Sequence, residues 1–135
     1  MKFQQPLVKA KLKKRYKRFL ADVEMADGSI VVAHCANSGS MKGLKDEGAT
    51  VWLSPNTNPK AKLDWRWELV EIGGTLIGIN TSHPNKIVEE AILDGTIKEL
   101  QGYDSLKREV KYGGNSRIDI LLEGKERCYV EVKNV

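Results

Sequence analysis

Residues 116–133 read SRIDILLEGKERCYVEVK, and this stretch predicts a β-hairpin that carries the most distinctive chemistry of the chain. Apolar and charged residues alternate on both sides of the Glu-Gly-Lys-Glu turn, as they do in strands with one buried face. With three residues in the turn, the register places Asp119 directly opposite Glu131, on the face that also carries Lys133. The hairpin is therefore predicted to bring two carboxylates and one ammonium group together.

Paired carboxylates suit a hard divalent cation such as Mg²⁺ or Mn²⁺, which keeps several waters and accepts one or two protein oxygens. A neighbouring lysine can orient or help to deprotonate an attacking water, so the set is suited to phosphodiester hydrolysis. Asp119 also lies between Ile118 and Ile120, where an uncompensated carboxylate would be costly. The same alternation is typical of a solvated sheet face, and that interpretation stays open beside the metal site.

The positive charge of the chain is concentrated at its N-terminus. Residues 1–20 contain eight of the 22 Lys and Arg residues and none of the 18 acids, so the other 115 residues carry 14 basic and 18 acidic groups. Such a concentration attracts phosphates and predicts nucleic-acid binding. Lysines that protect a strand edge from aggregation are the alternative. We call seven of these residues the basic patch: Lys9, Lys11, Lys13, Lys14, Arg15, Lys17 and Arg18.

Short strand-like segments separated by glycine turns fill the first 80 residues. We expect one long bulged strand over 6–25, and further strands at 29–34, 50–53, 65–72 and 75–80. This pattern favours a small closed barrel, with an OB barrel ahead of an SH3-like barrel. Trp65 and Trp67 share one face of their strand, where we expect one of them in the core and leave the other open as a base-stacking residue.

The pattern changes from strands to helices near residue 80. Ser82 is the expected N-cap of a helix that has Pro84 in its first turn and ends at Gly95. The spacing of Leu100, Leu106 and Val110 predicts further helix up to Glu109. No apolar run is long enough for a membrane span and no secretory segment is present, so we expect a cytoplasmic protein without a membrane partner. Cys35 and Cys128 are expected as small buried apolar residues rather than zinc ligands.

Several strings of residues, spread in order over the chain, carry a resemblance to a known family. They are HCANSGSM at 34–41, NPKAKL at 58–63, WEL at 67–69, GINT at 78–81, REVKYG at 108–113, SRID at 116–119 and VEVKNV at 130–135. The chain resembles the sugar fermentation stimulation A (SfsA) family in these strings. The resemblance implies an α+β protein, with an N-terminal five-stranded OB-fold β-barrel in residues 1–80 and part of a PD-(D/E)XK nuclease-like α/β domain in residues 81–135.

The resemblance also implies roles for particular residues. Glu109 corresponds to a helical acid, Asp119 and Glu131 to the two metal ligands, and Lys133 to the catalytic lysine, with Mg²⁺ or Mn²⁺ as the cofactor. Asn37 and Ser38 are expected to meet a phosphate or sugar. The alternative for this loop is a tight turn in which Gly39 takes a positive φ.

Two functions of different classes follow from this sequence. The first is a DNA-binding protein of the SfsA type that regulates sugar, notably maltose, metabolism and holds DNA mainly by phosphate contacts. The alternative is a Mg²⁺-dependent nuclease, and a barrel that binds a protein partner is a weaker third interpretation. Family members extend beyond the segment that matches the end of this chain, so we expect a truncated form or a fragment. The oligomeric state, including a homo-oligomer, is left open by the sequence.

Overall fold

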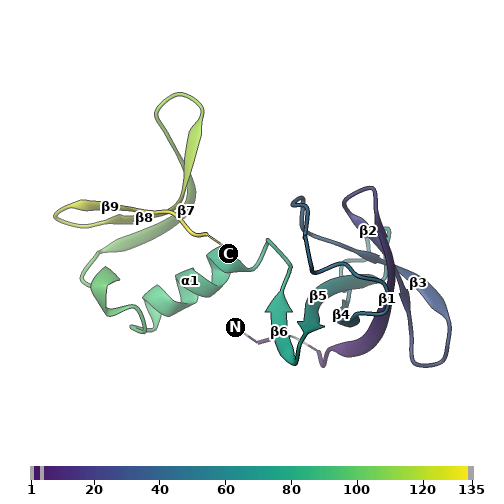
Figure 1. Cartoon of the computed structure of the whole chain (residues 1–135). Helices are drawn as coiled ribbons and strands as arrows, with labels where there is room; N and C mark the ends of the chain where they lie inside the picture. Colours follow the sequence, from purple (N-terminus) through teal and green to yellow (C-terminus); the bar gives the residue numbers. More distant parts are fainter. Residues whose placement is uncertain (1, 4, 134–135) are drawn as a thin grey trace. The chain divides into compact units, whose positions relative to one another are not determined.

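The computed structural model describes residues 2–3 and 5–133 and divides into two units, between Thr81 and Ser82. Asn134 and Val135, which end the last SfsA-like string, lie outside the described residues. The first unit is built from six strands (Figure 1): β1 (Val8–Tyr16), β2 (Leu20–Glu24), β3 (Ile30–His34), β4 (Thr50–Pro55), β5 (Trp65–Ile72) and β6 (Thr75–Gly78).

The first five strands close into a barrel. Their antiparallel order is β3-β2-β1-β4-β5, and a parallel pairing of β3 with β5, between Ala33 and Trp65, joins the two ends. Strand β6 adds to the outer edge of β5 as a hairpin. This connectivity confirms the predicted five-stranded OB barrel, in which closure leaves few exposed strand edges.

Alternation of side chains explains why β1 can be both basic and part of the barrel. Ala10 and Leu12 are buried in the core, while Lys9, Lys11 and Lys13 are exposed. The prediction of one long strand over residues 6–25 is wrong, because the chain turns back between β1 and β2. Lys17 and Arg18 make this turn with φ values of 51° and 64°, so no glycine, proline or asparagine announces it in the sequence.

The core of the barrel is centred on Trp67, which is fully buried together with Leu12, Val23 and Leu53. Its indole Nε1 donates a hydrogen bond of 2.9 Å to the carbonyl oxygen of Leu69, which satisfies the one polar atom of the side chain. Trp67 is thus the core tryptophan that the sequence predicts. Trp65 is partly buried and packs against the same core.

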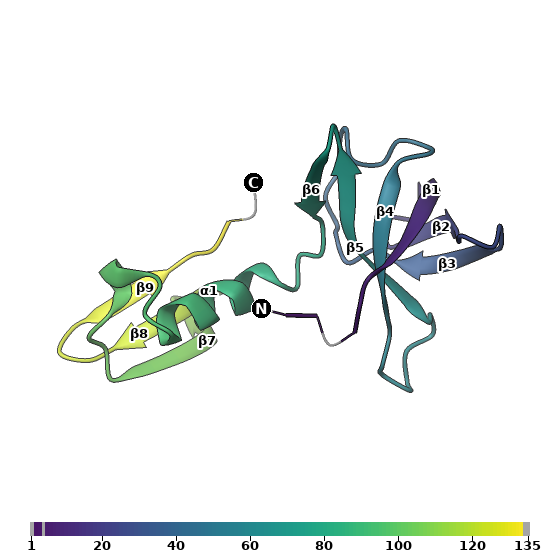
Figure 2. The same cartoon turned by 90° about the horizontal axis from the view of Figure 1, so that it is seen from below.

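The second unit contains one α-helix, a 3-10 turn and a three-stranded antiparallel sheet of order β7-β8-β9. Figure 2 shows α1 lying along the sheet, and Ile92 of the helix packs with Ile120 and Leu122 of β8. The PD-(D/E)XK-like character of this unit stays a prediction. Its elements are α1 (Pro84–Leu93), η1 (Lys98–Leu100), β7 (Ser105–Tyr112), β8 (Ser116–Glu123) and β9 (Arg127–Val130).

Two expectations for this unit are corrected by the structure. The N-cap of α1 is His83 rather than Ser82, with Pro84 as the first helical residue. The segment that holds Leu106, Glu109 and Val110 is strand β7, where we expected helix. Residues four apart share one face in a strand as well as in a helix, so the spacing of Leu106 and Val110 fits both.

The two cysteines differ in burial. Cys35 is fully buried beside Met41, and burial raises the pKa of its thiol, as expected for a small apolar core residue. Cys128 is half-buried in the second unit. In the described part of the chain, no helix is long and apolar enough to cross a membrane.

Candidate functional site

The hairpin of β8 and β9 has the predicted register. Glu123 pairs with Arg127 across a three-residue turn, and the pairing continues to Ile120 and Val130. Asp119 and Glu131 are the next two residues in this register. Strand β9 ends at Val130, however, so residues 131–133 leave the regular ladder at this point.

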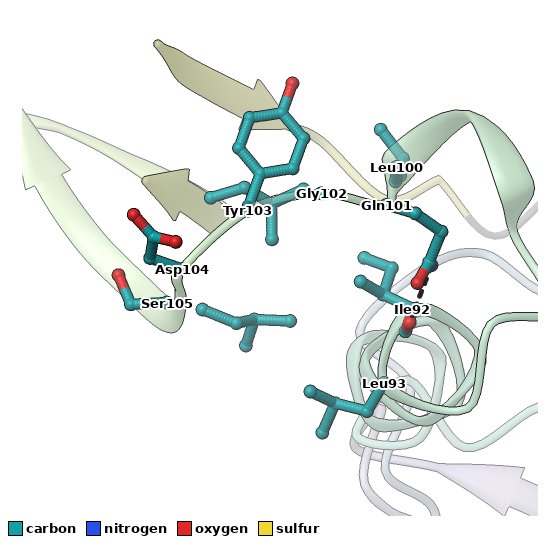
Figure 3. A pocket seen from close by; sticks show the side chains of 10 residues that line it. Ile92, Leu93, Leu100, Gln101, Gly102, Tyr103, Asp104 and Ser105 are labelled. Carbon is teal, nitrogen blue, oxygen red and sulfur yellow. Dashed lines mark hydrogen bonds between the residues drawn. The ribbon is translucent and has the colours of Figure 1, made fainter. Parts of the chain in front are cut away.

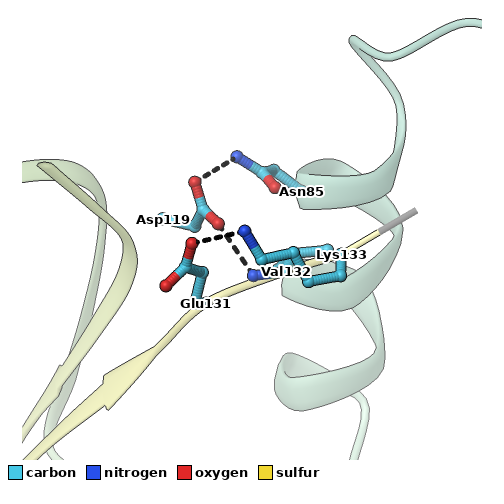
Figure 4. Close-up of polar contacts among 5 residues, drawn as sticks. All are labelled: Asn85, Asp119, Glu131, Val132 and Lys133. Atoms are coloured by element: carbon cyan, nitrogen blue, oxygen red, sulfur yellow. Dashed lines mark hydrogen bonds and ion pairs between the residues drawn. The ribbon is translucent and has the colours of Figure 1, made fainter. Parts of the chain in front are cut away.

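The carboxylate of Asp119 binds two donors from different elements (Figure 4). The backbone N–H of Val132 donates to Oδ2 at 2.7 Å, and Nδ2 of Asn85 at the start of α1 donates to Oδ1 at 3.3 Å. Asp119 therefore replaces the missing backbone acceptor beyond β9 and ties this segment to the helix. Each oxygen accepts one hydrogen bond from the described residues, and a carboxylate oxygen has a second lone pair that can bind another ligand.

Glu131 and Lys133 form an ion pair next to Asp119. Lys133 Nζ lies 2.7 Å from Glu131 Oε1, and the two side chains are 74% and 59% exposed. The hydrogen bond and charge of Glu131, with a smaller contribution from the charge of Asp119, raise the pKa of the Lys133 ammonium above its ordinary value. Lys133 therefore stays protonated across the neutral range, and its side of the ion pair is lost as the pH rises through this raised lysine pKa.

Glu109 lies on β7 rather than on the helix that the family pattern implies. Its strand neighbours Arg108 and Val110 pair with Ile120 and Ile118, which places Glu109 level with Asp119. The backbone of Glu109 has a φ of 55°, an uncommon conformation for a residue with a side chain, and one that tends to occur at functional sites. Glu109 and Asp119 thus lie level with each other on adjacent strands, while Glu131 directly follows the end of β9.

The described residues contain no group of three or more His, Cys, Asp or Glu that could hold a metal ion. The site is consequently a pair of carboxylates, Asp119 and Glu131, with the Lys133 ammonium beside them (Figure 4). Two carboxylates with further oxygen lone pairs meet the demand of Mg²⁺, which binds few protein ligands and keeps its waters. The donor set thus fits a hard cation if Lys133 gives up its contact with Glu131.

The structure divides the basic patch into supporting and accessible cations. Arg15 is a supporting residue, because its guanidinium donates to the carbonyl oxygens of Arg18, Asn37 and Ser40. Lys13 forms an ion pair of 3.5 Å with Glu24, and Lys11 donates to the hydroxyl of Thr50 at 2.8 Å. The remaining members are exposed: Lys9 lies over the Trp52 ring, Lys14 lies over the Tyr16 ring, and Lys17 and Arg18 form the β1–β2 turn.

The loop that follows β3 is held by Asn37. Its Nδ2 donates to the carbonyl oxygen of Ile79 at 2.9 Å, and its Oδ1 accepts from the N–H of Gly39 at 2.9 Å. The expected positive φ of Gly39 is wrong, since Met41 takes that conformation, with a φ of 52°. A Cβ at Gly39 would lie 3.1 Å from Asn37 Oδ1, a tight contact that a larger residue could make only if the Asn37 side chain shifts. Ser38 is exposed.

Asn37→Ala should therefore destabilise the barrel by about 1–2 kcal/mol, because it removes two hydrogen bonds and leaves the Ile79 carbonyl without this donor. Thermal or urea unfolding, followed by tryptophan fluorescence, measures this change. Ser38→Ala is the matched control and should leave stability within about 0.5 kcal/mol of the parent. Equal stability of the two variants would contradict the supporting role of Asn37.

Among the pockets of the described residues, one of about 430 Å³ adjoins Lys9 and Lys11 of β1, and two more lie beside loops. One of these two, also of about 430 Å³, lies against Leu20 and His34 of the barrel and a loop before β5. No sequence pattern predicts this pocket, although HCANSGSM and NPKAKL each contribute residues to it. The other, of about 210 Å³, lies between the end of α1 and residues 100–106 (Figure 3). There Gln101 donates to the carbonyl oxygen of Ile92 at 2.8 Å and holds this segment on the helix.

Comparison with known proteins gives a consistent result over the whole chain. Residues 14–79 match the family described as SfsA N-terminal OB domain, and residues 82–135 match the sugar fermentation stimulation protein RE domain. Sugar fermentation stimulation protein homologs from Paramagnetospirillum magneticum and Maricaulis maris are each 61% identical over 137 residues. The alignment covers 100% of this chain and 58% of each of these relatives, so the chain spans little more than half of their length.

A solved structure is also similar to both units. The structure of Pyrococcus furiosus SfsA in complex with Ca²⁺ matches with a TM-score of 0.84 and 26% sequence identity. The match covers 97% of this chain and 55% of the archaeal chain.

Proposed function

The chain belongs to the SfsA family of sugar fermentation stimulation proteins, and from this premise we propose that it binds nucleic acid through its barrel. The observation that supports the proposal most directly is the set of exposed cations on an OB barrel. Lys14, Lys17 and Arg18 lie on or next to the β1–β2 turn, and within the described part of the chain no carboxylate or carbonyl oxygen pairs with their side chains. We infer that DNA is the partner, with regulation of sugar metabolism, maltose included, as its setting.

The arrangement favours contacts to phosphates over contacts to base pairs. Exposed ammonium and guanidinium groups that alternate with buried apolar residues can follow a charged backbone, and they carry no sequence information by themselves. The proposed binding is therefore salt-dependent and largely independent of sequence. A barrel that binds a protein would lack this strong dependence on salt.

Salt titration tests the proposal. If the four accessible cations of the basic patch contact phosphates, the slope of log K against log salt should lie near about −2.8 to −3.6, since each contact contributes about −0.7 to −0.9. Replacing Lys14, Lys17 and Arg18 by Gln should flatten the slope by about 2 to 2.7. Fluorescence anisotropy with labelled DNA between low and physiological salt measures both slopes.

A second triple variant controls for the loss of net charge. Lys98, Lys111 and Lys125 are exposed residues of the second unit, and changing them to Gln removes the same three charges. The slope of this variant should stay close to that of the parent. If both triple variants flatten the slope equally, the basic patch is not the binding site. Arg15 is kept in both variants because it supports the 37–40 loop.

A second candidate function, hydrolysis of a phosphodiester, is supported by acidic residues in the second unit. Asp119 and Glu131 lie together beside Lys133, and Glu109 lies level with Asp119 in an uncommon backbone conformation. A related SfsA protein has been solved with Ca²⁺, a cation that takes the same oxygen ligands as Mg²⁺. We propose that Asp119 and Glu131 hold a divalent cation in this chain as well.

Each residue then has a separate task. The carboxylates of Asp119 and Glu131 bind and orient the cation. The hydrogen bond from the Val132 N–H keeps the Asp119 carboxylate in place. Lys133, released from Glu131, is positioned to orient a water or to stabilise negative charge on a phosphate oxygen. When bound, the cation supplies Lewis-acid activation of the phosphate. Metal dependence separates the two functions, because only hydrolysis requires the cation for turnover.

A further inference from the structure

The pocket beside His34, with a volume of about 430 Å³, lies on the outside of the barrel. Ala21 and Ala33 are fully buried in the core, so their strand neighbours Leu20 and His34 face outward. Leu20 and His34 are paired across β2 and β3 and form one side of the pocket. Its other side comes from the loop between β4 and β5, through Asn56, Ala61, Lys62 and Leu63.

This loop is held in one conformation by its own hydrogen bonds. The N–H of Asn56 donates to the carbonyl oxygen of Asp64 at 2.7 Å and closes the base of the loop. Asn56 Oδ1 accepts from the N–H of Asn58, and Asn58 Oδ1 accepts from the N–H of Lys60. These bonds fix the conformation of the loop itself, which favours a pocket that is formed before any ligand binds.

The lining combines apolar surface with unused hydrogen-bonding groups. Leu20 and Leu63 provide apolar surface, and the half-buried imidazole of His34 provides a flat ring. Within the described residues, neither the His34 ring nor the Asn56 Nδ2 group has a hydrogen-bond partner. A flat, partly apolar ligand with donors and acceptors on its edge matches this lining, and a nucleobase has these properties.

The cations around the pocket indicate that the base belongs to a nucleotide with phosphates on either side. Lys62 is part of the lining and is exposed, and Lys60 lies two residues before it in the same loop. Lys17 and Arg18 lie in the turn that leads into Leu20. Cations on both sides of the pocket suit the phosphates that precede and follow one nucleotide of a chain.

We propose that this pocket accepts one unpaired base of a single-stranded nucleic acid, with the flanking phosphates bound by the lysines of the β4–β5 loop and of the β1–β2 turn. The proposal rests on nucleic-acid binding by the barrel and adds the strand state and the site of the base. A base in a duplex is stacked and paired, so it cannot enter such a pocket without first being extruded. The pocket therefore selects single strands over duplexes.

Three labelled probes of about 12 nucleotides test the base pocket with the full chain: oligothymidylate, an abasic strand with the same phosphates, and a duplex of the same length. The parent should bind oligothymidylate at least about fivefold more tightly than the abasic strand or the duplex, as expected from the stacking of one base. A fourth probe, oligouridylate, shows whether the protein prefers ribose or deoxyribose. Tighter binding of either oligonucleotide than of the abasic strand supports a base in the pocket.

Pocket variants locate the effect. His34→Ala and Leu63→Ala should each weaken oligothymidylate binding by about fivefold or more and leave abasic binding and the salt slope unchanged. Ile30→Ala, at the exposed start of the same strand as His34, is the control and should bind all probes as the parent does. Far-ultraviolet circular dichroism shows whether each variant is folded. Because two pocket positions are changed separately, the test still works if one of the two variants does not fold.

The outcomes separate this proposal from nucleic-acid binding as such. Equal affinity of the parent for oligothymidylate, the abasic strand and the duplex overturns the base pocket. Silent pocket variants, together with a flattened slope after replacement of Lys14, Lys17 and Arg18, also overturn the pocket but leave phosphate binding by the barrel intact. Absence of binding to every probe overturns both.

Discussion

Asp119→Ala should lower the free energy of unfolding of the second unit by about 2–4 kcal/mol. The carboxylate accepts one bond from the Val132 backbone and one from Asn85 of α1, and hydrogen bonds to a charged group contribute about 1.5–3 kcal/mol each. The alanine variant leaves the Val132 N–H without this acceptor and releases the contact between β8 and the helix. Amide hydrogen exchange measures the change, because all three tryptophans lie in the barrel and report on the other unit.

Two further variants make this experiment specific. Glu131→Ala removes a neighbouring carboxylate whose ion pair is exposed to solvent, so it should cost less than about 1 kcal/mol. Asp119→Asn turns one of the two oxygens into an NH₂ group that faces a donor, and it should therefore also destabilise the unit. From the sequence alone the opposite is expected for Asn, since removing one of two close carboxylates relieves repulsion. An Asp119→Ala variant as stable as the parent would show that Asp119 is held for a cation and not for the fold.

The barrel could be predicted in large part from the sequence, because local signals determine it. Gly73 and Gly74 make the turn between β5 and β6 with positive φ values, as their sequence indicates. The turn at Lys17 and Arg18 could not be foreseen, since both residues adopt the left-handed conformation that sequence rules reserve for glycine and asparagine. The turn forms because β1 pairs with both β2 and β4, and this pairing depends on residues outside the turn itself.

The candidate site was predicted in register but not in detail. The pairing of Glu123 with Arg127 follows from turn length, and it brings Asp119 and Glu131 together as expected. The helix assigned to Glu109 was wrong because the Leu106 and Val110 spacing suits both elements. Neither the bond from Val132 to Asp119 nor the pocket beside His34 has a local signal. Both depend on where the chain folds back over a strand end, which is a tertiary property.

Cleavage of labelled DNA by this chain should require Mg²⁺ or Mn²⁺ and should fall at least about 100-fold in Lys133→Met and in Glu131→Gln. Removal of a positioned acid–base or electrostatic group commonly lowers a rate by about 10² to 10⁴. Lys133 is the cation nearest to the carboxylate pair, with Nζ 2.7 Å from Glu131. Lys125→Met, in the turn of the same hairpin, is the matched control and should cleave as the parent does. Single-turnover assays on a denaturing gel measure the rates, and chelation of the metal should reduce them to background.

The same assays decide between the two functions, because binding and cleavage are measured on one DNA. Glu131→Gln and Lys133→Met lie outside the barrel, so both variants should bind DNA with the parent's salt slope while they lose turnover. Loss of binding together with cleavage would place the nucleic acid on the second unit and contradict the role of the basic patch. Binding by the parent without turnover in either metal would leave Asp119 as a supporting residue of the hairpin, with the exposed ion pair of Glu131 and Lys133 beside it. The function would then be that of a nucleic-acid-binding barrel, since the contacts of Asp119 with Val132 and Asn85 explain its place between two isoleucines without any metal.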